Sequence, residues 1–184
     1  ACYAFTKKEV LEIERVTKEL FDLCMEAIEL VLTENRMNEF AIPAAFQQMI
    51  HESWDYDDPT LYGRFDLAYN DGQLKLLEFN ADTPTSLLEA SVVQWHWLRD
   101  FDDNLDQFNS IHEQLLDQLK YLIQRGIRKL HFAAVSDSDE DYMTVAYLMD
   151  CAQQAGLSIE YIDIEDIGWD GQRFMDLQER EIRH

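Results

Sequence analysis

Four polar side chains flank a predicted turn in the first half of the sequence. Arg64 and Asp66 precede the turn, and Glu78 and Asn80 follow it. Alternate residues of a strand point to one face, so each pair shares a face of its own strand. Two carboxylates and a carboxamide are the hard oxygen ligands that suit Mg²⁺, and a nearby guanidinium holds a phosphate or carboxylate through two hydrogen bonds. These residue types favour magnesium-dependent chemistry on a phosphate or a carboxylate.

The two pairs act together only if the hairpin brings them to one face. Opposed residue numbers in an antiparallel hairpin have a constant sum, which the loop length sets. A two-residue loop, Asp71-Gly72, makes the sum odd and places Asp66 and Glu78 on opposite faces. A three-residue loop, Asn70-Asp71-Gly72, makes it even when Gly72 is left-handed. The sequence leaves both registers open.

The even register has a specific consequence for the polar cluster. It would place Arg64 opposite Glu78, with Asp66 diagonal and Asn80 further along the same face. The other face would be apolar and would carry Phe65, Leu67, Leu77 and Phe79. A plain solvated face without a ligand is the alternative, because antiparallel sheets often face water on one side.

A hydroxyl-rich turn follows the second strand directly. The residues Asn80-Ala-Asp-Thr-Pro-Thr-Ser86 lead into a predicted helix, and the free N–H groups at a helix start bind anions. Thr83, Thr85 and Ser86 are therefore candidate anion-binding residues. The alternative is ordinary helix capping by Thr85 or Ser86.

The elements around these residues predict a mixed α and β fold. Apolar spacings of three and four predict five helices, and two apolar runs in the second half predict buried strands. A strand, a helix and a strand of this length predict a parallel, right-handed βαβ unit. The fold class is thus α/β: a helical segment plus a β-hairpin, followed by a βαβ unit. We expect a polar helix or a frayed end after the turn Gly168-Trp-Asp-Gly171. The predicted helices cover residues 7–35, about 43–54, 85–100, 110–125 and 141–155, and the strands 61–69, 73–80, 129–135 and 158–164.

Composition restricts the partners of the chain. The 184 residues include 37 acidic and 15 basic side chains, giving a formal charge of −22. Such a chain is unsuited to nucleic acid or an anionic membrane surface, whose phosphates need Lys and Arg, whereas a metal, a polyamine or another cation suits it. Three separated cysteines (Cys2, Cys24 and Cys151) form neither a disulfide framework nor a zinc motif. With no signal peptide pattern and no apolar run near ~20 residues, we expect a cytoplasmic location.

Long stretches of the sequence resemble the glutathionylspermidine synthase family, which are ATP-grasp amide ligases. The resemblance is carried by Leu-Tyr-Gly-Arg-Phe-Asp-Leu-Ala-Tyr (61–69), Leu-Leu-Glu-Phe-Asn-Ala-Asp-Thr-Pro-Thr-Ser-Leu-Leu-Glu-Ala (76–90), Val92-Val-Gln-Trp95, Phe108-Asn-Ser-Ile-His112 and Glu140-Asp141 with Thr144-Val-Ala-Tyr-Leu148. A resemblance over most of the chain is far more specific than a short motif. It implies the pre-ATP-grasp part of such a ligase over residues 1–184.

The resemblance implies a reaction and a role for each candidate residue. The family activates the glycine carboxylate of glutathione with ATP as an acyl phosphate, which a spermidine amine then attacks. Asp66, Glu78 and Asn80 would bind Mg²⁺, and Arg64 would be the catalytic residue beside the transferring phosphate. Thr83, Thr85 and Ser86 would bind glutathione. Asp139 and Glu140 would bind the amine. The alternative is a solvated loop or a helix N-terminus, where acidic residues are favoured without any ligand.

The resemblance also implies a partner for this chain. Family members are about twice as long, and the lysines that hold ATP lie on a later ATP-grasp segment that this sequence does not show. We therefore expect the chain to need that ATP-grasp half and to be inactive alone. Two alternatives stay open: a related ATP-grasp ligase with another amine or peptide substrate, and a non-catalytic binding fragment.

Overall fold

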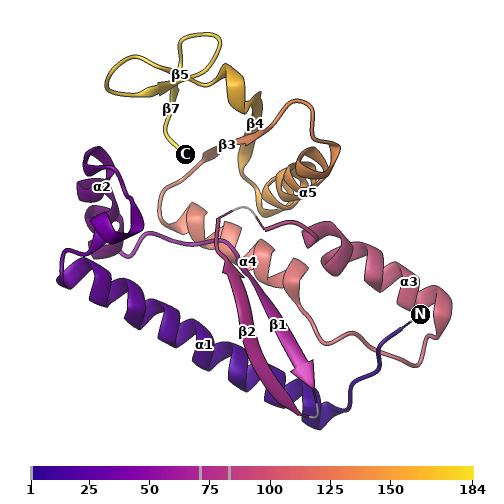
Figure 1. Cartoon of the computed structure of the whole chain (residues 1–184). Helices are drawn as coiled ribbons and strands as arrows, with labels where there is room; N and C mark the ends of the chain where they lie inside the picture. The colour runs from indigo at the N-terminus through magenta and orange to yellow at the C-terminus, as the bar shows by residue number, and fades with distance from the viewer. Residues whose placement is uncertain (1, 71, 83) are drawn as a thin grey trace. The chain divides into compact units, whose positions relative to one another are not determined.

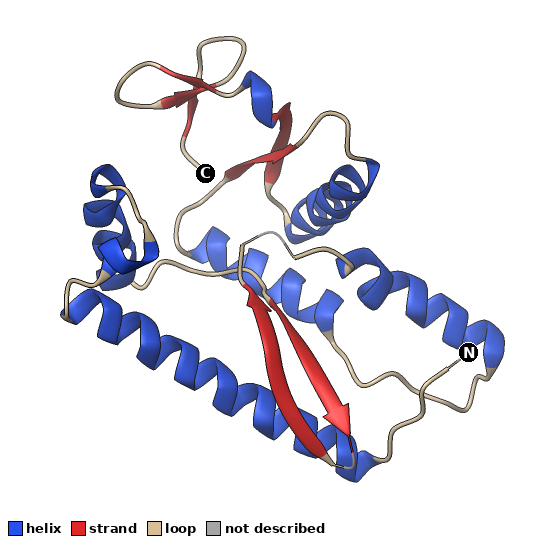
Figure 2. Cartoon of the chain, in the orientation of Figure 1, coloured by secondary structure: helices blue, strands red, loops and turns tan. Residues whose placement is uncertain are grey.

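The computed structural model describes residues 2–70, 72–82 and 84–184, and it divides into two compact units, Ala1–Asp82 and Thr83–His184 (Figure 1). Helices and strands occur in both units (Figure 2), which confirms the predicted mixed class. No helix among the described residues is long and apolar enough to cross a membrane. Each unit is described by itself below.

The first unit is built on one long helix. Helix α1 spans Lys7–Thr33, and its start is fixed by a capping box. The Thr6 hydroxyl accepts from the Glu9 backbone N–H at 3.3 Å, and Glu9 Oε2 accepts from the Thr6 N–H at 2.7 Å. A short 3₁₀ turn, Met37–Phe40, and helix α2, Ala44–Asp55, follow, with Pro43 at the α2 N-cap.

Strands β1 (Arg64–Asn70) and β2 (Gln73–Asn80) form an antiparallel hairpin with an irregular register. Next to the turn, Asn70 pairs with Gln73, which is the odd register of a two-residue connection; Asp71 itself lies outside the described residues. Between Asp66 and Leu67 the register shifts, so the partner changes from Glu78 to Leu76 and one residue of β2 is skipped. Beyond this β-bulge the pairing sum is even.

The bulge corrects two expectations about the hairpin. Arg64 lies opposite Asn80 and Asp66 opposite Glu78, so the predicted pairing of Arg64 with Glu78 is wrong. The skipped residue, Leu77, is 71 % exposed and is not part of a buried apolar face. The physical reason is that the even register comes from an extra residue inside β2 and not from a longer turn.

The other face of the hairpin carries its aromatic packing. Phe65 and Phe79 are cross-strand partners, and their rings stack with centroids 4.2 Å apart. Phe21 of α1 meets the Phe79 ring edge-on at 6.3 Å, and the Tyr69 hydroxyl donates to Glu9 Oε1 at 3.0 Å. These contacts hold α1 alongside the hairpin (Figure 1), with the polar residues on the opposite face.

The second unit contains a helical part and a parallel strand pair. A π-type turn, Glu89–Val93, continues into α3, Gln94–Phe101, and is followed by α4, Ile111–Gln124. Strands β3 (Lys129–Ala134) and β4 (Ser158–Asp163) pair in parallel and are joined by α5, Asp139–Ala155. A short 3₁₀ turn, Ile164–Asp166, follows β4. The core of this unit is apolar, and its buried members include Leu115, Leu119, Tyr147, Leu148, Cys151, Ala152, Leu157 and Ile162.

The last residues are not a helix or a frayed end, so that expectation is wrong. Three two-residue strands, β5 (Gly168–Trp169), β6 (Phe174–Met175) and β7 (Glu181–Ile182), form a small antiparallel sheet. Aspartate side chains close both of its turns. Asp170 Oδ1 accepts from the backbone N–H groups of residues 172 and 173, and Asp176 Oδ1 from those of 178 and 180.

Gly63, just before β1, lies close to the stacked rings of Phe65 and Phe79. A Cβ at this position would lie 2.7 Å from Cε2 of Phe79, a ring that is already stacked on Phe65. We expect Gly63→Ala to lower the free energy of unfolding by about 1–3 kcal/mol through overpacking. Chemical denaturation would measure this loss.

Gly168→Ala is the matched control, because its added Cβ would meet only ordinary contacts, the nearest at 3.7 Å. We expect this variant to change stability by less than about 1 kcal/mol. Equal stability of the two variants would contradict the packing argument.

Candidate functional site

The register of the hairpin places Arg64, Asp66, Glu78 and Asn80 on one face. Arg64 is opposite Asn80, and Asp66 is opposite Glu78, so the four side chains form two adjacent cross-strand pairs. Arg64 Nε donates to Asp66 Oδ1 at 2.8 Å, and their side chains are 36 % and 41 % exposed. The cluster is thus a half-open polar surface that a solute can reach.

The carboxylates on this face stabilise the positive charge of Arg64. The hydrogen bond to Asp66 and the nearby charge of Glu78 together raise the pKa of Arg64 above its ordinary value. The guanidinium therefore stays charged at every physiological pH. A fixed positive group beside two carboxylates suits a ligand that is itself an anion bound with a divalent cation.

Asn80 is oriented by the turn that follows it. Its carboxamide oxygen accepts from the backbone N–H of Asp82 at 3.2 Å. An amide oxygen has two lone pairs, so one remains available for a cation. With one oxygen from Asn80 and the carboxylates of Asp66 and Glu78, the donor set is composed of oxygen only and fits Mg²⁺.

The predicted anion-binding turn lies at the start of the second unit. Thr83 lies outside the described residues, Thr85 is half-buried, and Ser86 is exposed. Pro84, between them, is fully buried and anchors the turn. Ser86 has φ +65°, a left-handed conformation that costs free energy for a residue with a side chain. Its carbonyl accepts from Ala90 at 3.2 Å, just where the π-type turn begins.

Asp139 and Glu140 occupy the first turn of α5. Both are exposed, and the Ser138 side chain caps the helix by accepting from the Asp141 N–H at 3.3 Å. Acidic residues at this position interact favourably with the helix dipole. Their placement is therefore compatible with the structural alternative as well as with amine binding.

A cleft in the second unit is formed by residues whose proximity the sequence does not reveal. It has a volume of about 740 Å³ and is lined by residues of the π-type turn, α3, α4 and α5. His112, at its wall, had no partner that the sequence could reveal; the structure places its Nδ1 2.9 Å from the Tyr147 hydroxyl and 3.8 Å from Cys151 Sγ. Burial raises the pKa of the Cys151 thiol, so this pair is not an activated nucleophile.

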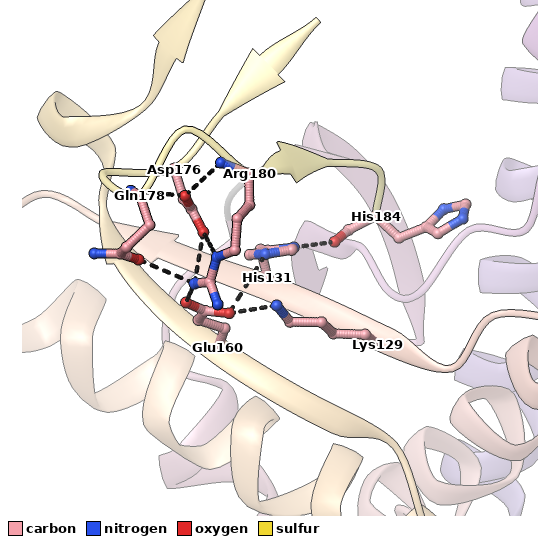
Figure 3. A network of polar contacts seen from close by, with 7 residues as sticks. All are labelled: Lys129, His131, Glu160, Asp176, Gln178, Arg180 and His184. Atoms are coloured by element: carbon pink, nitrogen blue, oxygen red, sulfur yellow. Dashed lines mark hydrogen bonds and ion pairs between the residues drawn. The ribbon is translucent and has the colours of Figure 1, made fainter.

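A second polar cluster joins the terminal strands to β3 and β4 (Figure 3). Lys129 and Arg180 both donate to Glu160, and Arg180 Nε also donates to Asp176 at 2.7 Å. Ligand atoms of His131, Glu160 and Asp176 lie within 4.8 Å of one another, a spacing that a metal ion could use. The two cations already balance the two carboxylates, and we therefore assign the cluster to structure and not to a metal centre.

The chain itself matches a ligase family. The sequence model of the glutathionylspermidine synthase preATP-grasp family matches residues 1–184, and the chain belongs to this family. The resemblance stated from the sequence is confirmed.

Three relatives show how widely the similarity extends. The chain is 40 % identical to a Haemophilus influenzae protein named "Putative acid–amine ligase", over 98 % of this chain and 47 % of that protein. It is 30 % identical to a trypanothione synthetase of Crithidia fasciculata, over 76 % of this chain and 22 % of the relative. It is 25 % identical to the bifunctional glutathionylspermidine synthetase/amidase of Escherichia coli, over 91 % of this chain and 28 % of the relative. The chain thus spans about half or less of the length of these relatives.

The terminal ion pairs predict an acid-sensitive contact. Hydrogen bonds from Lys129 lower the pKa of Glu160; burial acts to raise the pKa of Asp176, but hydrogen bonds from Arg180 and Gln178 outweigh it and lower that pKa. A carboxyl group whose pKa is lower in the folded than in the unfolded state stabilises the fold fully at pH values above its unfolded-state pKa. This stabilisation is lost as pH falls through the folded-state pKa. The stabilisation should therefore begin to fall as pH drops to the ordinary values of 4.5 and 3.8, and it should be lost only below the lowered folded-state values.

Thermal unfolding of Arg180→Gln, measured at neutral pH and near pH 3.5, would test this. We expect the substitution to lower the melting temperature at neutral pH and to lower it less near pH 3.5, where part of the stabilisation is already lost. Arg183→Gln is the matched control, because Arg183 is 74 % exposed and pairs only with Glu181 among the contacts described. A loss for Arg180→Gln that is equal at both pH values would exclude the ion pairs as its cause.

Proposed function

We propose that this chain is the metal- and substrate-binding part of an ATP- and Mg²⁺-dependent ligase that joins a carboxylate to an amine. The observation that carries the proposal is the hairpin face, where one guanidinium, two carboxylates and one carboxamide lie in two adjacent cross-strand pairs. Family membership and the ligase names of the relatives support the same class of reaction.

In this proposal, Asp66, Glu78 and Asn80 hold Mg²⁺ through oxygen atoms. When bound, Mg²⁺ and ATP would supply a polarised γ-phosphoryl group and offset the repulsion between the triphosphate and an incoming carboxylate. Arg64, already oriented by Asp66, would stabilise the charge on the transferring phosphate. The task of the chain is to position these groups.

The substrates are assigned by residue. Thr83, Thr85 and Ser86 would hold the acid, whose carboxylate oxygen attacks the γ-phosphorus to give an acyl phosphate and ADP. Asp139 and Glu140 would hold the amine, whose nitrogen attacks the acyl carbon and releases phosphate. Glutathione and spermidine are the proposed pair. An ATP-grasp half would supply the ATP-binding lysines. The Haemophilus influenzae relative is long enough to include such a half, because this chain covers 47 % of it.

A related ligase that uses another peptide or amine is the second candidate function. The relative with 40 % identity has a name that states only an acid and an amine, whereas the glutathionylspermidine synthetase/amidase is 25 % identical. A related ligase with another peptide or amine is therefore compatible with the same site. ATP hydrolysis that depends on both glutathione and spermidine, compared with other acid and amine pairs, would separate the two candidates.

Glu78→Gln tests the proposed metal ligand. In a protein that includes the ATP-grasp half, we expect a loss of about 100-fold or more in kcat, because the neutral amide removes a charged ligand and keeps the shape of the side chain. Coupled measurement of ADP release gives the rate, and circular dichroism checks the fold.

Glu14→Gln is the matched control, since Glu14 is exposed on α1 outside the hairpin face. It should leave turnover unchanged. Undiminished turnover in Glu78→Gln would reject the ligand assignment, and a protein without any ATP-dependent turnover would favour a non-catalytic binding fragment.

Asp139→Asn with Glu140→Gln tests the proposed amine site. We expect the KM for the amine to rise about tenfold with kcat nearly unchanged, because the carboxylates would act on binding and not on the chemical step. Steady-state kinetics with varied amine measure this split. A lower melting temperature with an unchanged KM would show that these residues serve only the helix dipole.

A further inference from the structure

The parallel pair β3 and β4 is small for a free-standing sheet. Among the described residues it contains these two strands only, whereas sheets in globular proteins usually have about four to six. Parallel sheets also occur almost only where neighbouring elements cover them. Each of the two strands therefore has one outer edge at which no described strand pairs.

Two backbone hydrogen bonds show which residues of β3 face which edge. The Ser158 N–H donates to the Arg128 carbonyl at 3.0 Å, so Arg128 faces β4. The His131 N–H donates to the His184 carbonyl at 2.7 Å, on the other side of the strand. Successive residues of a strand point their N–H and C=O groups to alternate edges, so Ala133, two residues after His131, also faces the outer edge.

His184 occupies part of this outer edge (Figure 3). Besides the backbone N–H, the ring nitrogen Nδ1 of His131 lies 3.0 Å from the same His184 oxygen. An antiparallel neighbour would return its own N–H to the His131 carbonyl, and His184 makes no such bond among the described contacts. The one-way bond is the pattern of a parallel neighbour. In that pattern, the residue two positions after His184 would donate to the His131 carbonyl and accept from the Ala133 N–H.

The outer edge of β3 has no feature that prevents strand pairing. Natural sheets protect open edges with proline, bulges or unpaired lysine. The strand Lys129–Ala134 contains no proline, its register with β4 is regular, and the Lys129 ammonium is bound to Glu160. An edge of this kind pairs with another strand when one is supplied.

We propose that the outer edge of β3 receives a third, parallel strand, formed by residues that follow His184 in the complete protein. The inference rests on the proposed function, in which an ATP-grasp half accompanies this chain. The Haemophilus influenzae relative has room for such residues, because this chain covers 47 % of it. His184 already lies at this edge, so a strand that begins there reaches Ala133 directly. The added strand would tie β3 to the ATP-grasp half through backbone hydrogen bonds.

Amide hydrogen exchange in the complete protein tests the hydrogen bond of Ala133. The reference is the Phe132 N–H, which faces β4 and should exchange slowly with or without a third strand. We expect the Ala133 N–H to exchange within about tenfold of this reference, whereas an amide at an open edge would exchange at least about 100-fold faster. Nuclear Overhauser contacts between the Ala133 N–H and the residues after His184 would identify the strand.

Ala133→Pro tests the same bond by mutation. It removes the N–H and places the proline ring at the outer edge, while the pairing with β4 does not use this group. In the complete protein we expect it to lower the melting temperature by about 5 °C or more. Ala133→Ser is the matched control, because it keeps the N–H and nearly the same side-chain size, and it should lower the melting temperature by less than about 2 °C.

Fast exchange of the Ala133 N–H, or equal melting temperatures of the two variants, would show that the edge is open and would overturn the proposal. Slow exchange that depends on protein concentration would assign the edge to a second copy of the chain, and Overhauser contacts with other residues would assign it to another segment. Either result overturns the proposal, as does a complete protein without residues beyond His184. A slow Ala133 N–H in a protein without ATP-dependent turnover would reject the ligase function alone, because the exchange needs neither ATP nor catalysis.

Discussion

The extra residue in β2 is the constraint on which the polar face of the hairpin depends. Next to the turn the strands pair in the odd register, in which Asp66 and Glu78 would lie on opposite faces. Skipping Leu77 shifts the pairing by one residue, and every side chain beyond it changes its cross-strand partner. The guanidinium, the two carboxylates and the carboxamide share a face because of this one residue.

The aromatic face of the same hairpin fixes that arrangement. Phe65 and Phe79 stack across the strands on the face opposite the polar residues. Phe21 of α1 meets the Phe79 ring edge-on. Gly63 lets the backbone pass this ring without a clash. A register slip would carry the aromatic residues to water and the charged residues toward α1, so burial of one face maintains the polar order of the other.

The two units use their acidic residues in different ways. In the first unit, Asp66 is half-open and accepts a hydrogen bond from Arg64, and Glu78, its cross-strand partner, is exposed. In the second unit, Glu160 and Asp176 are neutralised by Lys129 and Arg180, whereas Asp106, Glu113 and Asp150 surround a cleft without a lysine or arginine among its described lining residues. The hairpin face leaves negative charge exposed, and the cluster of Glu160 and Asp176 uses its negative charge to hold the terminal strands.

The sequence by itself determined the helices, the two strand pairs, the family and the four residue types of the hairpin, because periodicity, glycine and proline positions and long motifs are local properties. Only the tertiary structure decided the register, since a bulge depends on how two strands pack and leaves no local signal in Leu76-Leu77. It also decided the cleft, whose lining comes from segments between Leu88 and Asp150 that meet only after folding. The terminal sheet was missed because its strands are two residues long, too short for any alternation, and because aspartate side chains, not an apolar pattern, form its turns.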